Sequence, residues 1–129
     1  MKKLLLASMA LIALCCACKK ETTSIGLESY TYSFTSSGGT QTVTASDEDE
    51  YLRLSSLQES GGSAVEIKVS GSARTATIGW LTATEKSGTI LLKADANKSG
   101  SSRSAILKVT NTDGNDPVSV KITQSNQSN

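Results

Sequence analysis

The stretch TATIGWLTATEKSGTILLKA, Thr75 to Ala94, has one run with apolar residues, Thr75 to Leu81, before the polar sequence EKSG and another, Ile90 to Ala94, after it. Apolar residues that alternate with polar ones are typical of a β-strand with one buried face. The polar break at Glu85 to Gly88 is typical of a tight turn, because glycine tolerates backbone conformations that other residues avoid. This stretch therefore predicts two strands joined by a turn.

The same pattern extends outward over the chain. Further apolar or alternating runs lie at residues 30–34, 42–46, 51–55, 65–69, 106–109 and 118–122, with turn-forming sequences at 36–39, 59–63, 70–72, 97–102 and 111–117. Val65 to Val69 has the cleanest alternation and predicts a half-buried strand. About seven to eight short strands with no helical segment among them predict an all-β fold, an immunoglobulin-like antiparallel β-sandwich.

The first 17 residues have a different character. Lys2 and Lys3 precede an apolar run from Leu4 to Ala17 that only Ser8 interrupts. As a helix these 14 residues would rise about 21 Å, short of the ~30 Å hydrocarbon core of a bilayer. Residues 1–17 therefore predict a cleaved secretory signal peptide rather than a membrane-spanning anchor.

The chain has three cysteines: Cys15 and Cys16 lie near the end of this segment, and Cys18 directly follows it. A small residue followed by Cys after an apolar run resembles the lipobox of bacterial lipoproteins, and only Cys18 follows a small residue, Ala17. The resemblance implies cleavage before Cys18 and a diacylglycerol on its thiol, although Cys15 stands where the lipobox usually has Leu. An ordinary cleaved signal with a cysteine-rich end is the alternative. If Cys15 and Cys16 are removed and Cys18 is lipidated, we expect a domain without a free thiol or a disulfide.

These observations divide the chain into four segments. After the signal peptide, residues 18–26 form a lipidated cysteine and a polar tether, residues 27–125 form the sandwich, and residues 126–129 are a polar tail. Removing Lys2 and Lys3 leaves 13 − 2 = 11 basic against 12 acidic residues, which makes nucleic acid an unexpected partner. A lipid anchor predicts a place in the cell envelope, most simply the outer membrane, on its periplasmic face or at the cell surface.

Several short motifs carry a resemblance to a known family. In order, they are Phe34, Ser37-Gly38-Gly39-Thr40, Gln41-Thr42-Val43-Thr44, Trp80-Leu81-Thr82, Ser87-Gly88, Ala96-Asn97, Arg103-Ser104-Ala105 and Val120-Lys121-Ile122-Thr123-Gln124. Together they resemble the BACON domain, the Bacteroidetes-associated, carbohydrate-binding, often N-terminal family, over about Leu27 to Ser125. The resemblance implies a small immunoglobulin-like module on a secreted or surface protein, with either a carbohydrate-binding or a spacer role. This sequence has Tyr51 or Leu52 where the family often has Trp.

Four aromatic residues are candidate glycan contacts: Trp80, Tyr51, Tyr30 and Tyr32. Trp80, the only tryptophan, suits either a sandwich core or a sugar-stacking platform. Tyr30 and Tyr32 share one face of the first predicted strand with Phe34, which suits either a stacking surface or a core face edged by hydroxyls.

Other polar residues have structural explanations beside functional ones. The carboxylates of Asp47 to Glu50 suit a solvated turn, or oxygen ligands for calcium without the spacing of a known calcium loop. Asn97 and Arg103 flank a turn, where their side chains can bond to the backbone. The chain has no His and no serine-nucleophile motif, and Glu66, Glu85 and Asp95 are not placed together by any pattern. We therefore expect no enzyme activity and no cofactor.

Two hypotheses from different classes remain. The first is a lipid-anchored glycan-binding or adhesive module, which predicts an exposed aromatic patch. The second is a structural or protein-interaction domain of the envelope, which predicts buried aromatic residues and a sheet edge or loop set that meets a partner. The five aromatic residues of Trp, Tyr and Phe type are few for a sugar-binding protein, whereas the resemblance favours sugar binding.

Overall fold

The computed structural model describes residues 25–47, 49–112 and 116–127. The predicted signal peptide, Cys18 and most of the tether lie outside these residues. The predicted domain, 27–125, lies within them except for two short gaps. Among the described residues, no helix has the length and apolar composition to cross a bilayer.

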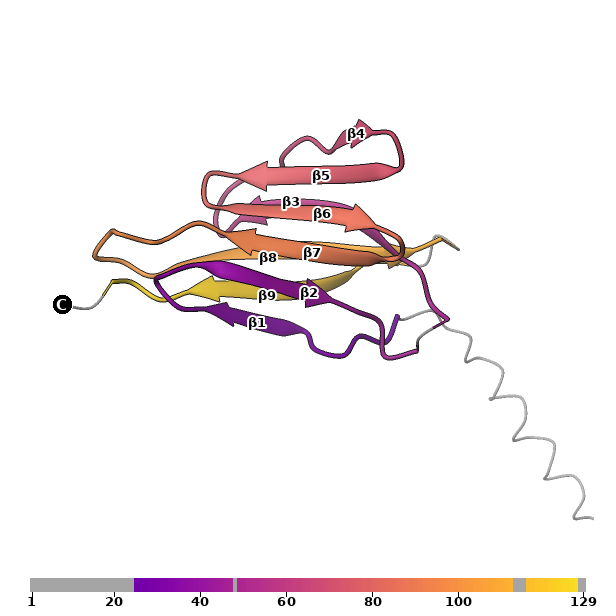
Figure 1. Ribbon diagram of the computed structural model, residues 1–129, viewed down its shortest axis with the longest axis horizontal. Coiled ribbons are helices and arrows are strands. Elements are labelled where there is room, and N and C mark those ends of the chain that lie inside the picture. The colour runs from indigo at the N-terminus through magenta and orange to yellow at the C-terminus, as the bar shows by residue number, and fades with distance from the viewer. Residues whose placement is uncertain (1–24, 48, 113–115, 128–129) are drawn as a thin grey trace, which may run out of the picture.

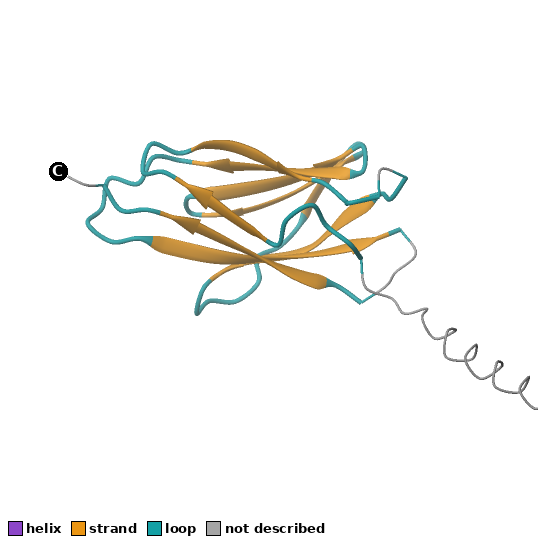
Figure 2. Cartoon of the chain, turned by 90° about the horizontal axis from the view of Figure 1, so that it is seen from below, coloured by secondary structure: helices purple, strands orange, loops and turns teal. Residues whose placement is uncertain are grey.

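The described residues form two β-sheets that pack face to face, without a helix (Figures 1 and 2). The nine strands are β1 (Thr31–Phe34), β2 (Gly39–Val43), β3 (Leu52–Glu59), β4 (Lys68–Ser70), β5 (Ala73–Ile78), β6 (Leu81–Lys86), β7 (Thr89–Ala94), β8 (Arg103–Asn111) and β9 (Val118–Gln124). One sheet has the order β1-β9-β8-β3 and the other β2-β7-β6-β5-β4. The predicted β-sandwich is confirmed, and no disulfide joins its sheets because the described residues contain no cysteine.

Strand direction departs from the prediction at one pair. Six of the seven strand pairs are antiparallel, whereas β1 runs parallel to β9, with Thr31 opposite Lys121 and Phe34 opposite Gln124. Sequence alternation carries no information on direction, and a parallel pair only needs a long connection between its strands. Here that connection is the rest of the sandwich.

The core lies between the sheets and is made by every second residue of the strands. Fully buried examples are Leu52, Leu54 and Leu57 of β3, Ile90 and Leu92 of β7, Leu107 and Val109 of β8, and Val120 and Ile122 of β9. At roughly 25 cal/mol per Å² of apolar surface removed from water, these side chains supply the main favourable term in folding. The alternation in sequence therefore marks the inward face of most strands correctly.

The prediction of a half-buried strand over Val65–Val69 is wrong. Only Lys68–Ser70 pair as β4, all three residues are exposed, and Val65 and Ile67 precede the strand as half-buried residues. The five-stranded sheet is one strand wider than the sheet that faces it, so the outermost strand β4 has nothing to cover it. Alternation in the sequence does not show whether a second sheet covers a strand.

The predicted run Thr75 to Leu81 is in fact two strands. β5 ends at Ile78 and β6 begins at Leu81, and these two residues pair across a two-residue turn of Gly79 and Trp80. This turn raises the count from about eight strands to nine. Neither turn residue is polar and Trp80 is buried, so no polar break in the sequence marks this turn.

The sandwich has two ends, which we call the entry end and the far end. The entry end gathers residues 25–27, 45–47, 49–51, 87–88 and 111–112, as the backbone bonds Ser46 N–H to Gly26 O and Leu52 N–H to Gly88 O show. The far end gathers residues 35–38, 59–62, 79–80, 95–103 and 124–127. The described chain thus begins at one end and finishes at the other (Figure 1).

Candidate binding site

Trp80 lies in the core at the far end. Its side chain and backbone are only 4% exposed, and its indole N–H donates to Glu59 Oε2 at 3.0 Å. The guanidinium carbon of Arg103 lies 4.9 Å from the ring centroid, within the range of a cation–π contact. The structure therefore places Trp80 where the core interpretation expects it, with no exposed ring face on which a sugar could stack.

Arg103 and its neighbours hold the far end together by hydrogen bonds. Arg103 Nε donates to Gln124 Oε1 at 2.8 Å, and buried Gln124 donates in turn to the carbonyls of Thr35 and Asp95. Asn97 is buried and donates to the carbonyls of Ser101 and Ser125, at 2.9 and 3.0 Å. Arg103 Nη2 also donates to the carbonyls of Asp95 and Ala96, at 3.4 and 3.3 Å. Asn97 and Arg103 thus have the backbone-bonding role that their turn positions predict.

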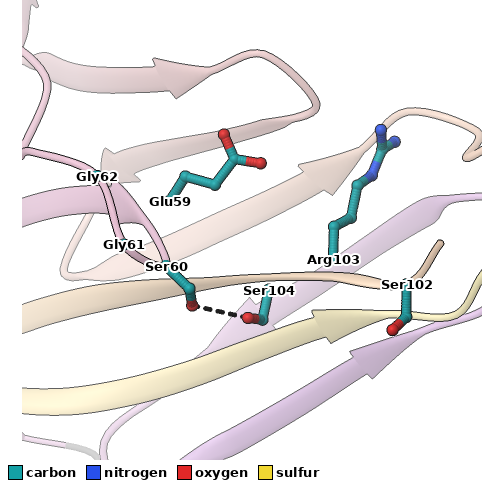
Figure 3. A pocket seen from close by; sticks show the side chains of 7 residues that line it. All are labelled: Glu59, Ser60, Gly61, Gly62, Ser102, Arg103 and Ser104. Atoms are coloured by element: carbon teal, nitrogen blue, oxygen red, sulfur yellow. Dashed lines mark hydrogen bonds between the residues drawn. The ribbon is translucent and has the colours of Figure 1, made fainter.

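A shallow pocket of about 430 Å³ opens above this cluster, between the β3–β4 connection and the start of β8 (Figure 3). We call it the Glu59 pocket; it is lined by Glu59, Ser60, Gly61, Gly62, Ser102, Arg103 and Ser104. Ser60 and Ser104 share a hydrogen bond of 2.7 Å between their hydroxyls. The lining is polar, and the Trp80 ring, which donates to Glu59 of the lining, is buried.

A second pocket, of about 480 Å³, lies at the entry end and contains an exposed aromatic ring. Tyr51 is 57% exposed and lines this pocket with Asp47, Asp49, Glu50 and Thr112. We call it the Tyr51 pocket. A ring with a free face beside several carboxylates offers an apolar surface and hydrogen-bond acceptors to the same ligand.

The position of the Tyr51 ring is set by the turn between β6 and β7. Ser87 and Gly88 form this two-residue turn and both have positive φ, 56° and 83°. A Cβ on Gly88 would lie 2.9 Å from two ring carbons of Tyr51, so the ring rests directly on the glycine backbone. Glycine is therefore required here both for the turn and for the contact with the ring.

The acidic run beside Tyr51 makes local hydrogen bonds. Asp47 Oδ1 accepts the backbone N–H of Asp49 at 3.0 Å, as in a turn, and Glu50 Oε2 accepts a hydrogen bond from the side-chain amide of Asn111. In residues 25–47, 49–112 and 116–127, no three acidic, His or Cys side chains are arranged to hold a metal ion. The bond between Asp47 and Asp49 is one typical of a turn.

Tyr30, Tyr32 and Phe34 do not form one exposed surface. Phe34 is buried, Tyr32 is half-buried, and Tyr30, 45% exposed, lies just before β1. The Tyr30 hydroxyl accepts from Leu27 N–H and donates to Ile25 O, both at 3.1 Å, which ties the start of the described chain to the sheet. Burial, and secondarily the negative charge of Glu28, raises the pKa of the Tyr32 hydroxyl.

The chain matches the BACON family over residues 66–125. That family is described as "Putative binding domain, N-terminal", and the match confirms the predicted resemblance over a shorter range than Leu27 to Ser125. No curated protein sequence matches the chain.

A solved structure has the same fold. It is the NMR structure of a protein from Bacteroides thetaiotaomicron, with a TM-score of 0.61 and 18% identity, and the alignment covers 84% of this chain and 86% of that one. At this identity the likeness shows the shared β-sandwich alone.

The BACON match covers the far-end cluster but leaves out most of the Tyr51 pocket. Trp80, Asn97, Arg103 and Gln124 fall within residues 66–125, whereas Tyr51 and its acidic neighbours Asp47, Asp49 and Glu50 precede them. The motif residues that carry the resemblance thus gather into a buried hydrogen-bonded structure. The exposed aromatic ring lies outside the matched range.

Sequence reasoning missed a charged cluster beside the Tyr51 pocket. Glu85, from β6, is 8% exposed and lies between Arg53 of β3 and Arg74 of β5, at 3.2 and 3.5 Å from their Nε atoms. In sequence, Glu85 reads as the first residue of a turn, and Arg53 lies 32 positions before it. Only the packing of the two sheets brings these residues together.

The three carboxylates considered for catalysis are not combined in one cleft. Glu66 and Asp95 are exposed on different segments, and Glu85 is buried between two guanidinium groups. Their placement offers no acid and base pair across a shared pocket.

Proposed function

We propose that this chain is a non-enzymatic glycan-binding module, held in the cell envelope by a lipid on Cys18. The proposal gives the binding role to the Tyr51 pocket. The family description of residues 66–125 as a binding domain names no ligand, and the proposal adds the ligand class.

The observation that carries the proposal is the exposed Tyr51 ring with carboxylates around it. A sugar has an apolar face of C–H groups and a rim of hydroxyls. The free face of Tyr51 matches the first, and the oxygens of Asp47, Asp49 and Glu50 can accept hydrogen bonds from the second. Because the ring rests on Gly88, little side-chain freedom is lost when a ligand binds.

Tyr51 variants test this assignment. The chain from Lys19 onward contains all the strands and core residues that the structure describes, so it can be titrated with neutral oligosaccharides from mucin and from plant polysaccharides while amide NMR shifts are followed. We expect shifts at Tyr51, Leu52 and Gly88 with at least one glycan. Tyr51→Ala should weaken this binding roughly tenfold or more through loss of the stacking face.

The matched control is Tyr51→Phe, which keeps the ring and removes only the hydroxyl. Its affinity should stay within about threefold of the natural chain. Equal affinity of Tyr51→Ala and the natural chain for a bound glycan would overturn the assignment to this pocket. Failure of every glycan in the panel to bind would overturn the proposed function itself.

A protein-interaction role is the second candidate, and one observation favours it. The edge strand β4 pairs on one side only, with β5, and its Val69 is exposed. An open edge with an exposed apolar residue is suited to pairing with a strand of another protein. Glycan binding that is sensitive to Tyr51 and insensitive to Val69→Lys would favour the first candidate over this one.

A further inference from the structure

A third pocket adjoins the Tyr51 pocket and carries the opposite charge. It measures about 330 Å³, and its polar lining includes Arg53, Ser55, Arg74 and Thr112. Thr112 also lines the Tyr51 pocket, so the two pockets share a wall. We call the third one the arginine pocket.

Strand geometry places the two pockets on the same face of the molecule. Tyr51 immediately precedes β3 and Arg53 is its second residue, with the buried Leu52 between them pointing inward. Residues two apart on extended chain point to the same side, about 7 Å from each other. A ligand that lies on the Tyr51 ring can therefore reach the Arg53 side chain with its next unit.

The arginine pocket has one positive charge in surplus. The single carboxylate of Glu85 faces two guanidinium groups, those of Arg53 and Arg74. Glu85 Oε1 also accepts the backbone N–H of Leu54 at 2.8 Å, which commits some of its charge to the backbone. One carboxylate cannot neutralise both cations.

Both guanidinium groups retain donors for a ligand. The Arg53 and Arg74 side chains are 38% and 28% exposed, so neither is sealed in the core. Of the five N–H donors in each group, Arg74 uses Nη2 for the carbonyl of Leu54 at 3.1 Å. Within the described residues, the Nη atoms of Arg53 donate to no protein acceptor and so remain available, whereas the Nε atoms of both residues are buried against Glu85 and are closed to a ligand.

We propose that Arg53 and Arg74 bind an acidic group, carboxylate or sulfate, on the same glycan whose neighbouring uncharged sugar stacks on Tyr51. Guanidinium groups bind planar and tetrahedral oxyanions through paired N–H donors, more strongly than they bind neutral acceptors. The inference rests on the proposed function, because it names the class of glycan that the Tyr51 pocket takes.

The acidic residues of the Tyr51 pocket determine which sugar unit lies in which pocket. Asp47, Asp49 and Glu50 line the Tyr51 pocket, where a second negative charge would be repelled. The acidic unit therefore lies over Arg53 and Arg74, and the uncharged unit lies over the ring. A glycan with acid groups on every unit would bind less well than one that alternates.

A matched set of lactose derivatives tests the inference. Lactose, sialyl-lactose and sulfated lactose share a neutral core and differ in bearing no acid, a carboxylate or a sulfate. Titrated into the chain from Lys19 onward, at least one acidic form should bind about fivefold more tightly than lactose. The form with the greater advantage identifies which oxyanion the pocket takes.

Arg53→Gln should remove this advantage, so that in this variant the acidic forms and lactose bind with equal affinity, because one of the two guanidinium groups that face the acidic unit is gone. Arg53→Lys keeps the charge without the paired donors and should restore only some of the advantage. Lys98→Gln, which removes one exposed charge at the far end, is the matched control and should change nothing. Amide spectra of each variant check that the sandwich is intact.

The outcomes separate this inference from the proposed function. Equal binding of all three sugars, or an advantage that survives Arg53→Gln, overturns the anion site while glycan binding at Tyr51 stands. Acidic sugars that depend on Arg53 and are indifferent to Tyr51→Ala uphold the anion site and overturn the stacking role. If none of the sugars binds, sodium sulfate and sodium acetate are titrated instead, and the absence of shifts at Leu54 and Ser55 overturns the anion site.

Discussion

The indole of Trp80 makes three kinds of contact. It packs in the core, its N–H donates to Glu59, and the guanidinium of Arg103 lies over the ring. Burial removes the large apolar surface of the tryptophan from water. The hydrogen bond from its N–H to Glu59 offsets the cost of burying a donor. At this position the side chain is thus a structural element of the far end.

Because Trp80 is the only tryptophan, its fluorescence reports this environment alone. We expect blue-shifted emission that iodide quenches weakly. Arg103→Ala uncovers the ring and breaks the bond to Gln124, so quenching should rise and stability should fall by roughly 1–2 kcal/mol. Lys98→Ala is the matched control. Efficient quenching of the unaltered chain would contradict the burial described here.

Tyr32 gives the domain a pH dependence in the alkaline range. Burial and Glu28 raise its pKa above the ordinary 10.0, so the folded state holds the hydroxyl proton more tightly than the unfolded chain does. The stability from this difference is complete below pH 10.0 and is lost as the pH rises through the folded-state pKa. Urea unfolding between about pH 8 and about pH 11 should therefore show a shallower decline for Tyr32→Phe. Identical profiles for the two chains would show that Tyr32 does not titrate in this way.

At the level of the strands, the edge of β3 is closed by side chains from the other sheet. The N–H of Leu54 bonds to Glu85 of β6, and its carbonyl accepts from Arg74 of β5. The register of β3 against β8 shifts between Leu54 and Ser56 at this place. The two sheets are thus joined by polar contacts at the edge where an open strand would otherwise present unpaired backbone groups.

Glu85→Ala should break this closure. It leaves a backbone N–H without its acceptor and two guanidinium groups without a counter-charge, at a cost of about 2–4 kcal/mol in urea unfolding. Glu85→Gln keeps an acceptor for Leu54 and should cost less. The opened edge should also promote self-association at high concentration, measured by size-exclusion chromatography. An Ala variant as stable and as monomeric as the Gln variant would contradict the closure.

How much of the fold follows from sequence can be judged strand by strand. Segments that alternate between well-marked turns, such as β9, are predicted because the inward face of the strand is encoded locally. The segment at Val65–Val69 is wrongly predicted because its burial depends on whether another layer covers it. The candidate site divides likewise: Tyr51 is identified as an aromatic residue, whereas the Arg53, Glu85 and Arg74 cluster depends on contacts between three strands.

For the molecule as a whole, the prediction with the widest consequence is the lipid on Cys18. Cys18→Ala should abolish incorporation of labelled fatty acid and release the protein from the membrane fraction. Cys16→Ala is the matched control and should still be labelled. Labelling that persists in Cys18→Ala would mean that the wrong cysteine was chosen, and absence of labelling in both would favour an ordinary cleaved signal.

A pull on the two ends of the described chain would load β1 and β9 in shear. The chain leads into β1 from the entry end and leaves β9 at the far end, and the two strands lie side by side in parallel. A pull between an anchor before β1 and a load after β9 slides one strand along the other and strains all four residue pairs of the ladder together. A terminal hairpin pulled from its open end would instead lose its residue pairs in succession. Resistance to a pull applied before β1 and after β9 is therefore a property of how these two strands are paired, independent of what the module binds.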